Sequence, residues 1–139
     1  MGNSVSTQKI NFEDIQYAQK QGSQYIIINT LPLNEQSCLI QGSINSNEEE
    51  TIINNLLSTN KCVNIIIYGK NNNDETIYKK VNQLLELGFS TIYLYVGGLF
   101  EWLLMQDIYG KDLFPTIGKE LDILKFCPKK KLNIKSLSY

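Results

Sequence analysis

Two hydrophobic patterns alternate along this chain. Short unbroken runs rich in β-branched residues occur at 24–29, 62–68 and 91–96. Between them, apolar residues recur every three or four positions, which is the spacing of one helical face. Strands without alternating polar positions are typical of a parallel sheet that is buried on both faces. The pattern therefore predicts βαβ units that form an α/β fold, with a mainly parallel central sheet of about five strands and helices on both faces.

Capping residues set the bounds of the predicted helices. Asn11 is placed to cap a helix that begins at Phe12 and ends at Gly22. Asn47 is the expected cap of a second helix, and the acidic run 48–50 suits the positive end of that helix. Its predicted inward residues are Ile52, Ile53, Leu56 and Leu57.

Two further helices follow the second and third hydrophobic runs. One ends at Gly88, in the position of a left-handed cap, and the other ends near Gly110. Residues 119–126 are expected to form a last short helix. The inward residues predicted for the two longer helices are Ile77, Val81, Leu84 and Leu85, then Leu99, Phe100, Leu103, Leu104 and Ile108.

Length and composition limit the chain to a single domain. The 139 residues are 42% hydrophobic, which suffices for one core. We expect a flexible leader at 1–9, a folded domain at 10–126 and a basic tail at 127–139. The chain contains no histidine and all 13 of its basic residues are lysine, so guanidinium clamps and imidazole general bases are excluded.

The cysteines argue against a disulfide framework and against a zinc site. Cys38, Cys62 and Cys127 are an odd number, widely spaced and without a CxxC pair. We expect reduced thiols, a cytoplasmic location, and neither a metal nor another cofactor.

Four segments in one order resemble a rhodanese-like domain over about residues 10–115. That family has an Asp-x-Arg segment after the first strand, a His-Ile-Pro-Gly-Ala-Ile-Asn-like stretch, an active-site loop that begins with Cys, and a Gly-Gly-x-x-x-Trp element. The resemblance implies a rhodanese-like three-layer fold, and a flavodoxin-like parallel domain is the alternative. The corresponding segments here are 26–31, 39–45, 68–74 and 97–102.

The departures from the family pattern concern its chemistry. Gly69 stands where the family has its sulfur-accepting cysteine, and Asp74 and Leu31 stand where it has arginines. The resemblance implies a persulfide mechanism that needs a thiolate, and positive charge nearby would activate that thiolate. We therefore expect a pseudoenzyme that works as a protein-binding, scaffolding or regulatory module. The related dual-specificity phosphatases use a Cys-x5-Arg loop, and the same losses exclude their activity.

Two alternatives remain open. An active sulfurtransferase could use a displaced cysteine, Cys38 or Cys127, whereas Cys62 lies about 20 Å from the loop at the far end of its strand. The second alternative is a structural component of a cytoskeletal or viral assembly.

The polar loop 69–75 and the segment near 29–33 are the predicted interaction surface. We interpret residues 70–73 as a solvated polar turn, Gly97 and Gly98 as a tight turn, and Trp102 as core. The candidate partner-binding residues are Asn29, Leu31, Lys70, Asn72, Asp74 and Glu75.

The two ends of the chain suggest membrane attachment. Gly2 and Ser6 fit a myristoylation pattern, and one acyl chain needs a second signal for stable binding. Lys129, Lys130 and Lys131 could supply it, because the last 15 residues hold 5 lysines and no acid, while residues 1–124 have a net charge of −6. An ordinary solvated tail, or one docked on the acidic domain, is the alternative. The acidic domain argues against nucleic-acid binding.

Overall fold

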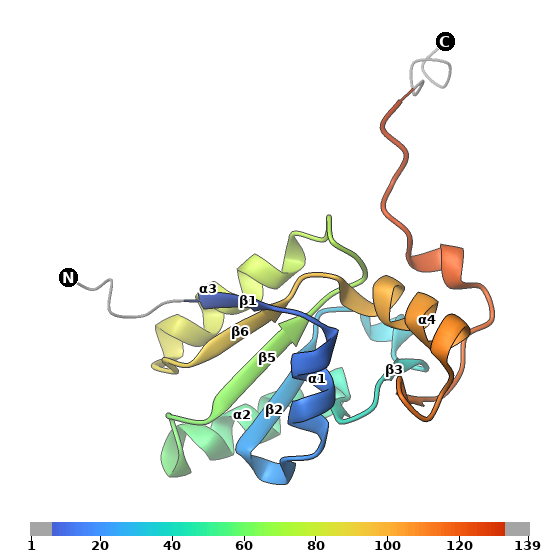
Figure 1. Ribbon diagram of the computed structural model, residues 1–139. Helices are drawn as coiled ribbons and strands as arrows, with labels where there is room; N and C mark the ends of the chain where they lie inside the picture. Colours follow the sequence, from blue (N-terminus) through green and yellow to red (C-terminus); the bar gives the residue numbers. More distant parts are fainter. Residues whose placement is uncertain (1–6, 133–139) are drawn as a thin grey trace.

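The chain folds around one parallel β-sheet, as the computed structural model in Figure 1 shows for residues 7–132. Five strands lie in the order β1-β6-β5-β2-β4, and every neighbouring pair is parallel. The predicted α/β class and the mainly parallel sheet are confirmed. The strands are β1 (Thr7–Ile10), β2 (Tyr25–Asn29), β4 (Ser43–Ile44), β5 (Asn64–Tyr68) and β6 (Ile92–Tyr95).

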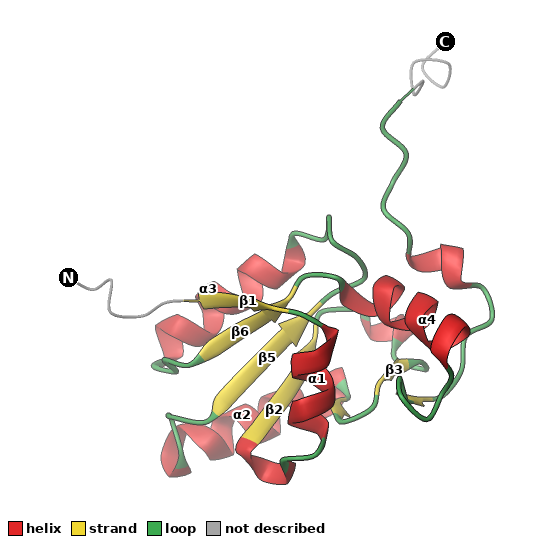
Figure 2. Cartoon of the chain, in the orientation of Figure 1, coloured by secondary structure: helices red, strands yellow, loops and turns green. Residues whose placement is uncertain are grey.

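Four α-helices connect and cover these strands, and short 3-10 turns and a small second sheet complete the fold (Figure 2). The small sheet pairs β3 (Leu39–Ile40) with β7 (Thr116–Ile117) in antiparallel fashion. The α-helices are α1 (Phe12–Gln19), α2 (Ser46–Thr59), α3 (Thr76–Leu87) and α4 (Gly98–Tyr109), and the 3-10 turns are η2 (Gly22–Gln24), η3 (Leu33–Glu35) and η4 (Ile123–Phe126).

The sheet separates two hydrophobic cores, so the fold has three layers. Adjacent residues of β5 point to opposite faces, because side chains alternate along a strand. Ile66 and Tyr68 belong to the core under α1 and α4, whereas Ile65 and Ile67 belong to the core under α2 and α3. This division explains why the strand is apolar at every position.

The helix bounds differ from the sequence analysis in three places. The first helix was predicted to end at Gly22, but α1 ends at Gln19 and Gly22 begins the 3-10 turn η2. Within 119–126 only the 3-10 turn η4 forms, and the start of α2 also differs. Asn11 caps α1 as predicted, and Gly88 ends α3 with a φ of 110°. The cap of α2 is Asn45 and not Asn47, because the Asn45 side chain accepts a hydrogen bond from the Asn47 amide. The acidic run remains in or next to the first turn of that helix.

The predicted inward stripe of α4 is wrong at two of its positions. Leu104 and Ile108 are 39% and 68% exposed. The buried side chains of α4 are Leu99, Trp102 and Leu103, so the face that packs is rotated toward Trp102. Trp102 is fully buried, as predicted, and its indole donates a hydrogen bond to the Pro115 carbonyl.

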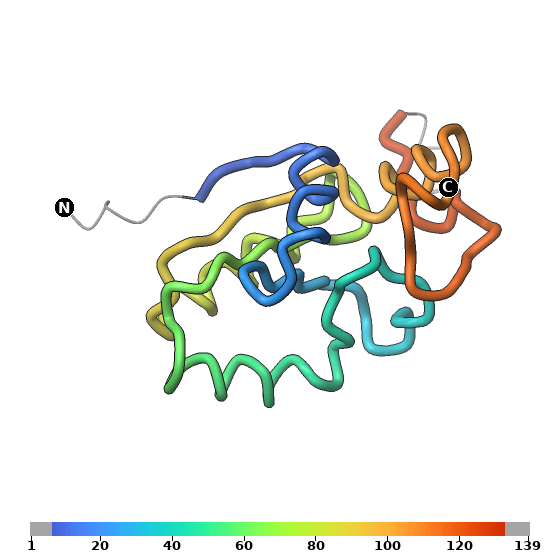
Figure 3. Tube along the Cα trace, turned by 60° about the horizontal axis from the view of Figure 1, so that its bottom comes forward, coloured from blue at the N-terminus to red at the C-terminus, as the bar shows by residue number. Residues whose placement is uncertain are grey.

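The predicted leader is wrong for its last three residues. Thr7, Gln8 and Lys9 form β1 together with Ile10, and β1 pairs with β6 at the edge of the sheet (Figures 1 and 3). Parallel pairing to an existing strand satisfies backbone groups that a free leader would expose to water. Residues 1–6, including Gly2, lie outside the described residues.

Candidate functional site

The loops after β2 and β5 meet at the carboxyl end of the sheet. The chain adds β4 on one side of β2 and then returns to add β5 on the other, so the order of strands reverses between β2 and β5. Ligand sites of open parallel sheets lie outside the carboxyl ends at such a reversal. Asn29 and Tyr68 end the two strands and are partners in register, which brings the loop 69–75 beside residues 30–33.

The carboxylate of Asp74 occupies the inside of the loop 69–75. One of its oxygens accepts a hydrogen bond from the Lys70 amide at 2.8 Å. The other accepts hydrogen bonds from the Thr76 amide at 3.0 Å and the Thr76 hydroxyl at 2.6 Å. The Asp74 carboxylate is therefore an internal anion that holds the loop to the first turn of α3.

Gly69 is buried directly behind this carboxylate. A Cβ atom built on Gly69 would overlap the Asp74 carboxylate and lie 3.0 Å from the Thr30 hydroxyl oxygen. The space that a side chain at position 69 would need is thus already filled by a neighbour. The position that the family resemblance assigns to cysteine offers no nucleophile, and a side chain there would have to displace the Asp74 carboxylate.

The start of α4 holds the loop from the opposite side. The Leu99 amide donates to the Gly69 carbonyl at 2.9 Å, and the Phe100 amide donates to the Lys70 carbonyl at 2.8 Å. Gly98 has a φ of 71°, and a Cβ there would come within 3.0 Å of backbone atoms of Gly69 and Asn71. The predicted tight turn at the two glycines is confirmed, and it allows this close approach.

Asn71 joins the loop to the C-terminal part of the chain. Its side chain donates a hydrogen bond to the Phe126 carbonyl at 2.9 Å and accepts one from the Asn73 amide at 2.8 Å. Asn71 is only 9% exposed, so the expectation of a fully solvated turn is wrong for this residue. A buried polar side chain whose hydrogen bonds are satisfied fixes the loop against the tail.

Two predicted partner-binding residues are buried. Asn29 is 2% exposed, and its amide bonds with Gln36, with the Ile44 carbonyl and with the Leu31 amide. Leu31 is 4% exposed and lies in the core under α1 and α4. These two residues hold the loop after β2 in place and expose almost no surface, although both line the groove between α2 and α3 described below. The next two residues, Pro32 and Leu33, are exposed instead.

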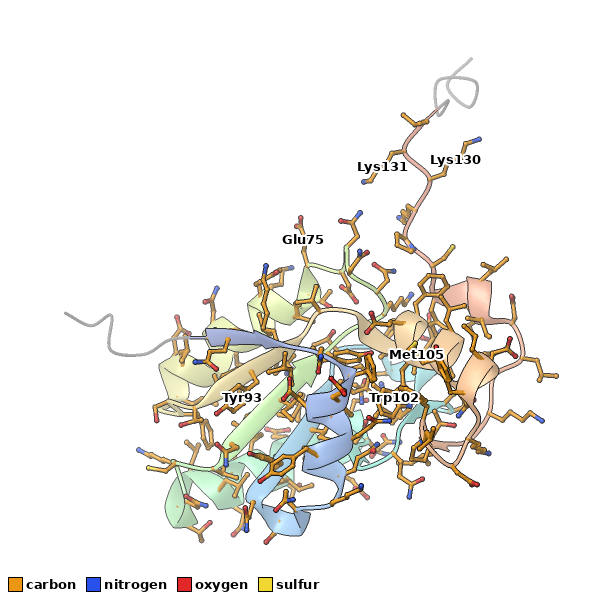
Figure 4. The ribbon with its side chains drawn as sticks, in the orientation of Figure 1. Glu75, Tyr93, Trp102, Met105, Lys130 and Lys131 are labelled. Carbon is orange, nitrogen blue, oxygen red and sulfur yellow. The ribbon has the colours of Figure 1, made fainter. Side chains whose placement is uncertain are left out.

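The remaining predicted residues lie in the loop 69–75, and their role in binding a partner stays a prediction. Lys70 forms an ion pair with Glu35 at 3.4 Å, and Asp74 is the internal anion described above. Asn72 and Glu75 are exposed, and Figure 4 shows the Glu75 side chain pointing away from the sheet.

A cavity of about 490 Å³ lies between the loop and the tail. Sequence reasoning did not place the tail at this site. It assigned the tail lysines to a membrane surface, with a solvated tail or one docked on the acidic domain as the alternative. Phe126, an apolar residue just before Pro128, was the one signal that the tail returns to the core. The lining residues are Thr30, Pro32, Lys70, Asn71, Asn73, Asp74, Glu75, Thr76, Lys129 and Lys131.

A larger groove of about 680 Å³ runs between α2 and α3. It shares Thr30 and Thr76 with the loop cavity, and the hydroxyls of these two residues are hydrogen-bonded at 2.7 Å. An ion pair between Glu49 and Lys80 at 2.5 Å lies in this groove. Glu49 therefore serves more than the helix dipole, which was the only role expected from the sequence.

None of the three cysteines lines the loop cavity. Cys62 is exposed and precedes β5 at the opposite end of the strand, and Cys127 is exposed in the tail. Cys38 is buried, and burial together with the Glu120 charge raises the pKa of its thiol. A raised pKa disfavours the thiolate, which is the form of Cys38 that sulfur chemistry would need.

The described residues hold neither a cluster of metal ligands nor a membrane-spanning helix. Within residues 7–132, no three Cys, Asp or Glu side chains gather closely enough to hold a metal ion. No helix in the same range is both long and apolar enough to cross a bilayer.

Comparison with known proteins places the fold and the loop in one family. The family model of the rhodanese-like domain matches residues 13–105, and a search of the curated proteins found no match. The architecture is that of a three-layer α/β domain whose candidate-site loop, 69–75, follows the central strand β5. The chain belongs to the rhodanese-like domain family.

Solved structures of other proteins share this fold. The Alr3790 protein from Anabaena sp. is 23% identical, with a TM-score of 0.57 and 84% of each chain covered. The BH2092 protein from Bacillus halodurans is 18% identical, with a TM-score of 0.59 over 94% of this chain and 89% of that one. A thiosulfate sulfurtransferase from Pseudomonas aeruginosa is 18% identical, with a TM-score of 0.55 over 70% of this chain and 19% of its own. At these identities the likeness concerns the fold alone.

Proposed function

We propose that this chain is a catalytically inactive rhodanese-like domain that acts as a protein-binding module. Its interaction surface consists of the loop 69–75 and the exposed residues Pro32 and Leu33 beside it. The observation that carries the proposal is the filled position behind the loop. Gly69 supplies no nucleophile, and the Asp74 carboxylate occupies the adjacent space.

Charge inside the loop supports the loss of chemistry. A thiolate or an oxyanion would have to share the loop with the Asp74 carboxylate, and like charges at this distance repel. Asp74 already accepts the hydrogen bonds of the Lys70 and Thr76 amides, which are the donors that an incoming anion would need. The loop is therefore complete without a ligand at its centre.

The outer side of the loop is suited to contact another protein. Leu33 is 79% exposed beside the loop, and Asn72 and Glu75 are exposed on it. The backbone beneath is fixed by Asp74, Asn71 and the start of α4, as described above. Rigid loops that present exposed side chains lose little entropy on binding.

The first experiment measures thiosulfate sulfurtransfer and persulfide formation by the purified protein. We expect no activity above the buffer rate. A variant in which Cys38, Cys62 and Cys127 are all replaced by Ser is the control. Activity in the wild type that disappears in this variant would mean that a displaced cysteine performs the chemistry, and the proposal would be wrong.

A pair of reverting variants tests the filled loop directly. Gly69→Cys alone should give a thiol that overlaps Asp74, so no persulfide should accumulate. Combining Gly69→Cys with Asp74→Ser removes the carboxylate and should make the new thiol accessible to a thiol reagent. Equal labelling of position 69 in the single and the double variant would show that Asp74 does not block it.

The binding surface is tested by capturing partners from cell extract with immobilised protein. Asn72→Ala combined with Glu75→Ala should lower capture of whatever the wild type retains. Asn82→Ala combined with Glu86→Ala is a matched control, because these residues are of the same types and are exposed on α3. Equal capture by the loop pair and the control pair would remove the loop from the interaction surface.

Acylation of Gly2 is a separate proposal that rests on the sequence pattern alone. Myristate at Gly2 would hold the domain at a membrane only together with a second signal. Metabolic labelling with an alkyne-tagged myristate, compared with Gly2→Ala, tests it. Absence of label on the wild-type chain, expressed with Met1 at its start, would remove this proposal without affecting the binding module.

A further inference from the structure

The C-terminal segment forms one wall of the loop cavity. Phe126 is 2% exposed in the core under α1 and α4, and its carbonyl accepts the hydrogen bond from Asn71. Residues after Phe126 leave the core beside the loop (Figure 1). The family match ends at residue 105, so this wall is an addition to the part of the chain that resembles the family.

Two of the three consecutive tail lysines face this cavity. Lys129 and Lys131 line it, whereas Lys130 does not. Figure 4 shows Lys131 on the side of the loop and Lys130 on the opposite side of the segment. Alternate residues of an extended chain point the same way, which accounts for this division.

The lining of the cavity carries three lysines and two acids, and its two tail lysines make no ion pair within the described residues. Among the ion pairs of residues 7–132, none involves Lys129 or Lys131. Lys70, the third lysine of the lining, is paired with Glu35. Of the two acids in the lining, the Asp74 carboxylate is hydrogen-bonded inside the loop, and Glu75 is exposed at its edge.

We propose that this cavity binds a glutamate- or aspartate-rich segment of a partner protein. This inference rests on the proposed binding function and gives the chemistry of the partner. A volume of about 490 Å³ lies within the usual range of ligand sites and suits a few side chains of an extended peptide. Ammonium groups act as point charges and pair with single carboxylates without the bidentate geometry of arginine.

The geometry favours a peptide over an anionic membrane. A bilayer surface is broad and would engage the outward Lys130 at least as strongly as the two lysines that face the loop. A carboxylate side chain can enter a concave site between the loop and the tail. The contribution of Lys130 relative to Lys129 and Lys131 therefore separates the two ligands.

The test measures binding of a fluorescein-labelled octaglutamate peptide to the full chain by fluorescence anisotropy at low salt. Replacing both Lys129 and Lys131 by Ser should weaken binding about fivefold or more, since each exposed charge pair contributes modestly. Lys130→Ser is the matched control and should change the affinity by less than about twofold.

Three results would overturn the inference. One is a loss of affinity for Lys130→Ser equal to the loss for each lysine that faces the loop, measured one at a time. Another is no peptide binding by the wild type. The third is binding to vesicles with 30% phosphatidylserine that all three lysines support equally, in the absence of peptide binding.

Failure of this inference and failure of the proposed function are distinguishable. The Asn72 and Glu75 variant could lose partner capture while the lysine variants keep it. That result would support the proposed binding module and contradict an acidic partner. Sulfurtransfer by the wild type would remove the inactive module whatever the peptide result.

Discussion

The ends of β5 and β6 look alike in sequence but are built on different physical requirements. Each strand ends in a buried tyrosine, Tyr68 or Tyr95, and the two are partners in register. Each is followed within three residues by a buried glycine, Gly69 or Gly98. Gly98 has a positive φ and lies against backbone, whereas Gly69 lies outside the left-handed region and against the Asp74 side chain.

The difference shows which glycine the fold requires. A residue other than glycine at position 98 would need a strained backbone and a displaced loop. At position 69 the overlap is with the Asp74 side chain, beside a close contact with the Thr30 hydroxyl, and side chains can move or be changed. Gly98 therefore belongs to the architecture of the loop, and Gly69 belongs with Asp74 to the proposed loss of chemistry.

The largest effect is expected at Gly98. Gly98→Ala should lower the free energy of unfolding by about 3 kcal/mol, because left-handed strain adds to a backbone overlap. Urea denaturation measures this change. Gly22→Ala is the matched control, since Gly22 has a φ of 62° with open space around it, and its cost should be about 1 kcal/mol. Equal costs at both positions would show that the close approach to the loop is unimportant.

A double-mutant cycle tests the pairing of Gly69 with Asp74. Gly69→Ala should cost about 2 kcal/mol by displacing the Asp74 carboxylate from its amide donors. In an Asp74→Ala background the same change should cost less than about 0.5 kcal/mol, because the overlap is gone. Additive costs in the cycle would separate the two residues and contradict the account of the filled loop.

The two tyrosines should make the protein sensitive to alkali. Burial raises the pKa of both, and a hydrogen bond from the Tyr95 hydroxyl to Glu101 raises the pKa of Tyr95 further. The unfolded chain loses these protons above about pH 10 while the folded protein keeps them. The free energy of unfolding should therefore fall above that pH, by about 1.4 kcal/mol per pH unit for each tyrosine.

A phenylalanine variant tests how much Tyr68 contributes to this loss of stability at alkaline pH. Tyr68→Phe removes hydrogen bonds with the Ile40 amide and the Ser43 hydroxyl, so it should cost about 1 kcal/mol at neutral pH and reduce the alkaline slope. Urea unfolding at several values between pH 8 and 11 measures both. The exposed Tyr109 provides a control, and Tyr109→Phe should leave the slope unchanged. An unchanged slope in Tyr68→Phe would show that its pKa is not raised.

The smallest effect concerns the reactivity of the cysteine thiols, and this prediction involves no change in stability. Cys62 and Cys127 should react rapidly with a thiol reagent in the folded protein, and Cys38 should react only on unfolding, because it is buried and the pKa of its thiol is raised. Cys38→Ser should therefore leave the number of fast thiols unchanged. A fast thiol that this variant removes would revive the displaced-cysteine alternative.

Local patterns gave most of the framework, and they failed where a choice depended on neighbours distant in sequence. The strand runs and the Gly88 cap were placed within a residue or two, since periodicity and capping act within one element. The cap of α2 was misplaced because Asn45 and Asn47 are both good caps, and the turn before the helix decided between them. The face of α4 was misjudged because that helix is apolar on several sides, and packing under Phe114 and Phe126 selected Trp102.

The candidate site divides in the same way. The absence of a thiol at position 69 was readable from the chain, as was the polar loop around it. The inward turn of Asp74, the burial of Asn29 and Leu31, and the arrival of Lys129 and Lys131 at the loop were not. Each of these depends on contacts between segments separated by many residues, or on the hydrogen bonds of one closed turn.

The sequence by itself determined the alternation of strands and helices, the membership of a family and the glycine at the position where the resemblance expects the family's nucleophile. These follow from hydrophobic periodicity, local caps and residue identity, which need no knowledge of distant contacts. Only the tertiary structure decided that the emptied position is filled by Asp74 and that the tail completes the cavity. Those outcomes arise from side-chain packing and satisfied hydrogen bonds between remote segments, which no local pattern encodes.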